Sequence, residues 1–123
     1  MHVSDALISP QVAGVTAVIS CAALFVAVRQ IKKNNDDKII PIMGVTGAFI
    51  FAAQMINFSI PGTGSSGHIV GGILLSTLLG PWAALITLTS VLVIQCLVFA
   101  DGGLMALGSN VLNMAVISSS TFF

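Results

Sequence analysis

The chain has 123 residues, of which 56% are hydrophobic and only 7% are charged, and its formal net charge is zero. A soluble domain carries about 25% charged residues, so this composition points to a protein that uses the bilayer as its solvent. The lack of net positive charge gives no reason to expect nucleic acid as a partner. We find no nucleotide-binding loop, catalytic triad or paired carboxylates, and no glutamate anywhere, so the sequence does not predict an enzyme.

Apolar segments of the length that crosses a bilayer, about 20 residues, follow one another along most of the chain. The stretch 69–100 is too long for one helix, and Gly80-Pro81 divides it because proline lacks the amide donor and disfavours helical geometry in the residue before it. We therefore predict an all-α fold, a polytopic membrane helix bundle of about five transmembrane helices in a single domain, residues 1–123. The predicted helices cover residues 8–28, 39–58, 68–79, 82–100 and 104–118.

The positive charges of the chain all lie between the first two predicted helices. The positive-inside rule places that connection in the cytoplasm. The N-terminus lacks the basic region and cleavage site of a signal peptide, so we expect it to be retained and to lie outside. Counting crossings then puts His2, His68 and Asp101 together on the outer side. The basic residues are Arg29, Lys32, Lys33 and Lys38.

The first two residues, Met1 and His2, offer three nitrogens to one metal ion. The terminal amine, the deprotonated His2 amide nitrogen and the His2 imidazole can close a five-membered and a six-membered chelate ring. Such a set favours square-planar or tetragonal metals, which points to Ni(II) or Cu(II), with Co(II) possible. An accidental histidine at a frayed terminus is the alternative, although this terminus leads directly into a predicted spanning helix. We expect Asp5 either to cap that helix or to add charge near the metal.

The second histidine of the chain, His68, follows a segment rich in glycine and serine, residues 61–67. Glycines let the backbone approach a ligand closely, and Ser66 can orient an imidazole or cap the next helix. A flexible loop with an interfacial histidine is the alternative. We therefore take His68 as the candidate fourth ligand.

Several polar side chains are expected near the same outer side. Amides in spanning helices either bridge helices by hydrogen bonds or hold a ligating histidine in one tautomer. Asn110 and Asn113 are three residues apart, so we expect them to share a helix face. Asp101 is most simply a turn residue before two glycines. The residues expected to surround the ligands are Asn57, Ser66, Asp101, Asn110 and Asn113, with Gln54 near Asn57.

Short motifs in a fixed order run along almost the whole chain. They are Met1-His2-Val3 with Asp5, residues 51–58 (FAAQMINF), Pro61-Gly62-Thr63 leading to Ser66-Gly67-His68, Leu79-Gly80-Pro81-Trp82, residues 99–103 (FADGG), and Leu107-Gly108 with Asn110 and Asn113-Met114-Ala115. In order and spacing this set resembles the CbiM family, the substrate-capture subunit of energy-coupling-factor cobalt transporters, with the NikM nickel proteins as near relatives.

The resemblance implies that Co(II), or alternatively Ni(II), is held by the Met1 amine, the amide and imidazole nitrogens of His2, and the imidazole of His68. It implies a multi-pass protein of a bacterial or archaeal cell membrane. The implied partners are a transmembrane coupling subunit, cytoplasmic ATPase subunits that hydrolyse the ATP, and a small accessory membrane subunit. Family members continue with further spanning helices after Ala115, so the resemblance also implies a chain shortened at its C-terminus.

Other functions are compatible with the same residues. A nickel-specific homologue is one, because cobalt and nickel both accept nitrogen ligands. A truncated membrane fragment that does not transport is another. The third is a passive channel or small exporter, because glycine-rich helices can pack closely around a pore.

Overall fold

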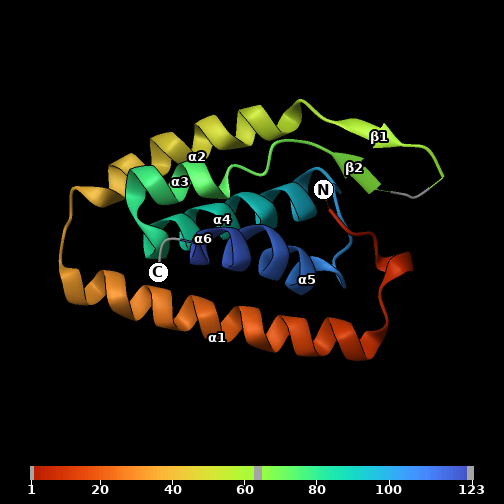
Figure 1. The fold of residues 1–123 in the computed structure, drawn as a ribbon, viewed down its shortest axis with the longest axis horizontal. Coiled ribbons are helices and arrows are strands. Elements are labelled where there is room, and N and C mark those ends of the chain that lie inside the picture. The colour runs from red at the N-terminus through yellow and green to blue at the C-terminus, as the bar shows by residue number, and fades with distance from the viewer. Residues whose placement is uncertain (1, 63–64, 122–123) are drawn as a thin grey trace.

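Helices make up most of the computed structural model, which describes residues 2–62 and 65–121 (Figure 1). In chain order the elements are η1 (Asp5–Leu7), α1 (Pro10–Asn34), α2 (Ile39–Met55), β1 (Phe58–Ile60), β2 (Ser65–Gly67), α3 (Gly72–Leu79), α4 (Pro81–Val98), α5 (Leu107–Val111), η2 (Leu112–Ile117) and α6 (Ser118–Ser120). The last three follow without a break and form one helical unit. The predicted all-α bundle of about five helices is therefore confirmed, with one short β-ribbon added to it.

The first helix, α1, has clear signals at both ends. Ser9 is its N-cap and accepts a hydrogen bond from the Val12 amide at 3.3 Å, and Pro10 occupies the first helical position. The helix ends at Asn35, which adopts the left-handed conformation with φ 49°. It runs six residues beyond its predicted end because the basic side chains that follow residue 28 are compatible with a helix and favour its C-terminal end.

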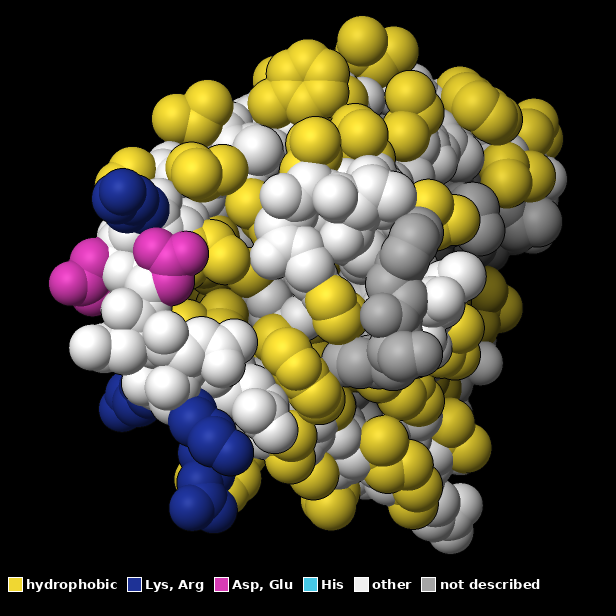
Figure 2. Space-filling model, turned by 60° about the vertical axis from the view of Figure 1, so that its left-hand side comes forward, with side chains coloured by type: hydrophobic (Ala, Val, Ile, Leu, Met, Phe, Trp, Pro, Cys, Tyr) yellow, Lys and Arg dark blue, Asp and Glu magenta, His cyan; other side chains and the backbone are white. Residues whose placement is uncertain are grey.

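Among the described residues, two helices are long and apolar enough to cross a membrane, namely α1 and α4, whose 18-residue windows have mean hydropathies of 2.1 and 1.9. Large apolar side chains of α1, such as Val15, Val18 and Phe25, are exposed. In Figure 2 hydrophobic side chains cover much of the visible face, whereas Lys, Arg and Asp gather at one edge. This surface suits contact with lipid along the helices and with water at that edge.

The core is organised around α4, which contacts α1, α2, α3 and the C-terminal helical unit. Leu85, Leu88 and Leu92 of α4 are fully buried, together with Leu75 of α3 and Ile50 of α2. Most of α4 is buried, although Ser90, Ile94 and Leu97 are exposed along one side, so its apolar residues are not confined to one stripe. The other helices thus pack against α4 as the central helix of the bundle.

Small residues bring α1 and α5 into close contact. Ala13, Ser20 and Ala27 are the buried residues of α1 and recur every seven positions, so they form one seam. The Ser20 hydroxyl donates to the Gly108 carbonyl at 2.8 Å. A Cβ on Gly108 would lie 2.6 Å from the Ala17 Cα, so glycine is required for this approach. Close backbone packing of this kind is typical of helices in membranes.

The structure differs from the predicted helices in the segment around His68. The second helix was predicted to reach residue 58 and the third to start at 68, but residues 58–60 and 65–67 pair as an antiparallel ribbon. Gly62, with φ +78°, lies in the turn that follows β1. Helix α3 starts only at Gly72, because Gly71 has φ +79°, which an α-helix does not tolerate. His68 therefore lies in the irregular connection between the ribbon and α3.

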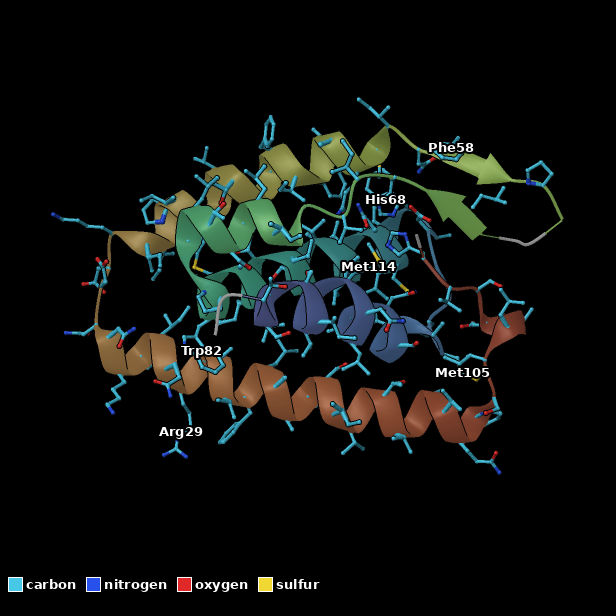
Figure 3. The ribbon with its side chains drawn as sticks, viewed as in Figure 1. Arg29, Phe58, His68, Trp82, Met105 and Met114 are labelled. Atoms are coloured by element: carbon cyan, nitrogen blue, oxygen red, sulfur yellow. The ribbon has the colours of Figure 1, made fainter. Side chains whose placement is uncertain are left out.

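The two ends of the bundle differ in character. The connection between α1 and α2, with its basic residues, lies at one end, and the N-terminal segment and the β-ribbon lie toward the other (Figure 1). Figure 3 shows Arg29 pointing away from the bundle and His68 lying within it. The candidate ligands and the basic connection therefore lie toward opposite ends of the bundle.

Candidate metal centre

The N-terminal segment is seated against the connection between α4 and α5. The Val3 amide donates to Asn110 Oδ1 at 2.7 Å, and Asn110 Nδ2 donates to the Val3 carbonyl at 3.3 Å. The Gly103 amide also donates to the Val3 carbonyl, at 3.4 Å. One asparagine side chain therefore satisfies both backbone groups of Val3, as a strand partner would, and this holds the neighbouring His2 in a buried position.

The Asp5 carboxylate forms a second anchor for the same segment. Its Oδ1 accepts a hydrogen bond from the Ala106 amide at 2.8 Å. Asp5 therefore does not cap α1, where Ser9 has that role. Two glycines make room for the N-terminal segment. A Cβ on Gly102 would lie 3.0 Å from two carbons of His2, and a Cβ on Gly103 would lie 2.7 Å from the Asp5 nitrogen and overlap its carboxylate.

Gly103→Ala is expected to weaken metal binding by displacing this segment. A methyl group forced against the Asp5 backbone costs about 1–3 kcal/mol, which corresponds to a roughly 5- to 150-fold rise in the Kd for Co(II) in calorimetry. Gly14→Ala is the matched control, since nothing lies within 4 Å of the added Cβ and alanine favours a helix. Equal Kd values for the two variants would show that the position of Asp5 against Gly103 does not affect metal binding.

The imidazole rings of His2 and His68 lie against each other. Nδ1 of His2 and Nε2 of His68 are 3.0 Å apart, and the ring centroids are 4.9 Å apart with an interplanar angle of 45°. Two nitrogens bound to one metal at about 2.0 Å and at right angles would be about 2.8 Å apart, and opposite nitrogens would be about 4 Å apart. The pair thus has the spacing of adjacent ligands. The same distance also suits a hydrogen bond between neutral rings in the absence of a metal.

The surroundings keep both rings neutral at pH 7. Burial lowers the pKa of His2 to about 4, although the carboxylate of Asp101 opposes the shift, and charge on His68 adds to it. Burial also lowers the pKa of His68, against the hydrogen bond of its Nδ1 with the Ile69 carbonyl at 3.0 Å. A carbonyl can only accept, so His68 Nδ1 carries the proton and its Nε2 carries the lone pair that faces His2.

Asp101 completes the immediate surroundings of His2. Its Oδ1 is 3.4 Å from Nδ1 of His2, and its Oδ2 is buried without a hydrogen-bond partner among the described residues. The residue before it, Ala100, has φ 51°, and the Asp101 amide donates to the Gln95 carbonyl at 3.0 Å, so the end of α4 fixes its place. Asp101 therefore supplies negative charge beside the two rings rather than only a turn.

The remaining predicted residues lie elsewhere. Asn57 is exposed before β1, and Asn113 is exposed although Asn110 is buried, because the wider π-turns of η2 start at residue 112 and change the face that follows. Met1 and the side chain of Ser66 lie outside the described parts of the structure. The candidate centre that the described residues form thus consists of His2, His68 and Asp101, with Asn110 holding the segment.

Sequence reasoning did not single out Gln95 or the two glycines beside the N-terminal segment. Gln95 is the one amide in the predicted helix 82–100, and a lone amide in an apolar segment is a usable signal. Within residues 2–62 and 65–121, no group of three or more His, Cys, Asp or Glu is arranged to hold a metal. Two imidazoles alone are therefore an incomplete ligand set, and backbone nitrogens would have to supply the rest.

Comparison with known proteins identifies the family. The model of the family described as "Cobalt uptake substrate-specific transmembrane region", CbiM, matches residues 2–123. A putative fused nickel transport protein of Archaeoglobus fulgidus is 45% identical over 96% of this chain and 39% of its own length. A cobalt transport protein of Clostridium tetani is 32% identical over 95% of this chain and 49% of its own length.

Solved structures agree with this. The crystal structure of a transition metal transporter superposes with a TM-score of 0.87 at 44% identity, covering 95% of this chain and 51% of that one. A truncated transition metal transporter gives a TM-score of 0.86, also at 44% identity, covering 94% of this chain and 53% of that one. The chain thus spans between 39% and 53% of the length of these four relatives.

Proposed function

Because the chain belongs to the CbiM family of cobalt uptake transmembrane proteins, we propose that it captures a divalent transition metal ion, Co(II) in the first place, for import. The proposed ligands are the Met1 amine, the His2 amide nitrogen, Nδ1 of His2 and Nε2 of His68. The observation that carries this proposal is the 3.0 Å separation of the two imidazole nitrogens. Both are unprotonated at neutral pH when the metal takes their lone pairs.

Chelate geometry supports the choice of His2 Nδ1. A six-membered ring from the His2 amide nitrogen through Cα, Cβ and Cγ closes at Nδ1, and Nδ1 is the atom that faces His68. The terminal amine and amide nitrogen then fill the two remaining positions of a square plane. Such a plane suits Ni(II) and Cu(II) best by geometry and also accepts Co(II), and affinity alone would favour copper.

The charge balance of the proposed site is favourable. A divalent ion, one deprotonated amide and two neutral imidazoles sum to one positive charge, and the Asp101 carboxylate beside His2 neutralises it. A neutral complex avoids the large cost of leaving net charge in a water-poor site. We propose that this site lies at the outer face of the membrane and the basic α1–α2 connection at the cytoplasmic face.

We further propose that release of the ion depends on partners, namely a transmembrane coupling subunit, ATPase subunits and a small accessory membrane subunit. Nickel is the alternative cargo, because relatives named for nickel and for cobalt both match this chain. A passive channel is the second candidate, and it predicts metal flux into liposomes that contain this chain alone.

Titration of the purified chain, with Met1 as its first residue, is expected to give one bound Co(II) or Ni(II) per chain. The Ni(II) complex should show the absorption of a square-planar nitrogen site, because all four ligands are nitrogens in one plane. Calorimetry and absorption spectra recorded with both metals in parallel measure this. No saturable binding of either ion would overturn the proposal.

A further inference from the structure

A hollow on the surface of α1 brings three cationic side chains together with two apolar ones. Its volume is about 620 Å³, and it lies at the end of the helix that leads into the α1–α2 connection. All of its lining residues belong to α1, and Figure 2 shows Lys and Arg side chains at one edge of the molecule. The lining residues are Phe25, Val26, Arg29, Gln30, Lys32 and Lys33.

The hollow faces away from the rest of the bundle. Phe25, Arg29 and Lys32 follow one another at spacings of four and three residues, so they share one face of α1. That face lies roughly opposite Ala27, which is buried against the bundle. Phe25 is 64% exposed, and Figure 3 shows Arg29 pointing outward. In a membrane this face therefore meets lipid rather than another helix of this chain.

The three cations lack an anionic partner within the described chain. Among residues 2–62 and 65–121, no carboxylate lies within ion-pair distance of Arg29, Lys32 or Lys33. Asp36 and Asp37 of the connection do not line the hollow, and Oδ1 of Asp36 accepts a hydrogen bond from a backbone amide of the same turn. The negative charge that balances the hollow must therefore come from outside these residues.

The length of α1 brings these charges to the depth of lipid phosphates. Its 25 residues extend about 37 Å, whereas the hydrocarbon layer is about 30 Å thick. The apolar part that precedes Arg29 extends about 28 Å, so it fills that layer by itself. Arg29 then stands among the headgroups. Its guanidinium carbon lies 5.6 Å from the ring centroid of Phe25, an attractive contact that holds it at the boundary.

We propose that this hollow binds the headgroup of an anionic phospholipid, with the phosphate on Arg29 and the two lysines and the acyl chains along Phe25 and Val26. A guanidinium offers two parallel N–H donors to a phosphate, and the Gln30 amide adds a neutral donor. A zwitterionic phospholipid fits less well, because its own cationic group meets like charge. The inference requires α1 to cross a membrane, but it does not depend on the proposed metal ligands.

The test titrates phosphatidylglycerol into the purified chain in a neutral detergent and counts bound lipids by native mass spectrometry. We expect one phosphatidylglycerol per chain, bound more tightly than phosphatidylcholine. Each basic side chain near an anionic lipid contributes a factor of about 5, so Arg29→Gln should raise the apparent Kd about 5-fold. Adding Lys32→Gln and Lys33→Gln should bring the rise to about 100-fold.

Lys38→Gln is the matched control. It removes one positive charge from the same connection but outside the hollow, so it should leave the Kd unchanged. Each single variant keeps three of the four basic residues, so the charge signal for insertion remains. A far-UV circular dichroism spectrum checks that the variants stay helical.

Two further measurements separate a lipid site from a site for free phosphate. Inorganic phosphate in large excess should not displace the lipid, because it lacks acyl chains, and Phe25→Ala should weaken lipid binding. Displacement by phosphate would overturn the assignment to a lipid. Equal Kd values for phosphatidylglycerol and phosphatidylcholine would overturn it too. So would an Arg29→Gln variant that binds like Lys38→Gln, and this face would then be left for an acidic protein partner.

Discussion

Adding one residue ahead of Met1 is expected to abolish high-affinity binding of Co(II). The extension turns the terminal amine into an amide, and the new amine is too far along the chain to close the five-membered chelate ring. The proposed square plane therefore loses the amine ligand and the chelate ring that it shares with the His2 amide nitrogen. Loss of even an outer partner commonly costs 10- to 100-fold in affinity, so we expect a rise in Kd of more than about 100-fold in calorimetry.

A cleavable extension provides the control for this experiment. When a site-specific protease removes it and leaves Met1 first, binding should return to the level of a chain that carries its tag at the C-terminus. Binding of Co(II) by the extended chain with the parent affinity and the parent absorption spectrum would rule out the terminal amine as a ligand. It would leave the contact between the two imidazoles to be explained without a chelate.

His68→Ala is expected to reduce binding by a similar amount, because only the three nitrogens of the first two residues then remain. The Ni(II) absorption band should also shift, since water or another weak ligand takes the vacant position in the plane. The measurement is parallel titration with Co(II) and Ni(II), together with a thermal melt in detergent that checks the fold of the variant.

Ser59→Ala is the matched control for His68→Ala. Ser59 is exposed on β1, the strand that pairs with the segment leading to His68, so its replacement changes the same ribbon without touching the proposed ligands. If both variants bound metal equally well, His68 would not be a ligand. A loss of thermal stability in His68→Ala alone would instead mean that the ring contact with His2 holds the fold.

The bundle could be predicted from the sequence because hydropathy and helix breakers act locally. Gly80-Pro81 separates α3 from α4 as expected, since a proline removes an amide donor wherever it stands. The β-ribbon was missed, because its strands have three residues each and are stabilised by each other across the turn. The late start of α3 at Gly72 depends likewise on a backbone angle at Gly71 that no spacing of apolar residues reveals.

The candidate centre could be predicted only in part. The charge asymmetry of the loops placed His2, His68 and Asp101 on one side, but it carried no information about distances. Gln95 was missed because its side chain donates a hydrogen bond to that of Gln54, which lies 41 positions away in the sequence. Gly102 and Gly103 were predicted only as part of a turn. The sequence does not show that the N-terminal segment occupies the space that a Cβ on either glycine would fill.

The hydrogen bonds between Val3 and Asn110 join residues 107 positions apart, almost the full length of the chain. Val3 is synthesised long before Asn110 and must therefore wait for it before it can take its final place. Until then the segment that carries His2 lacks the hydrogen bonds that hold it. If the proposed centre binds an ion, loading would therefore follow biogenesis rather than accompany it.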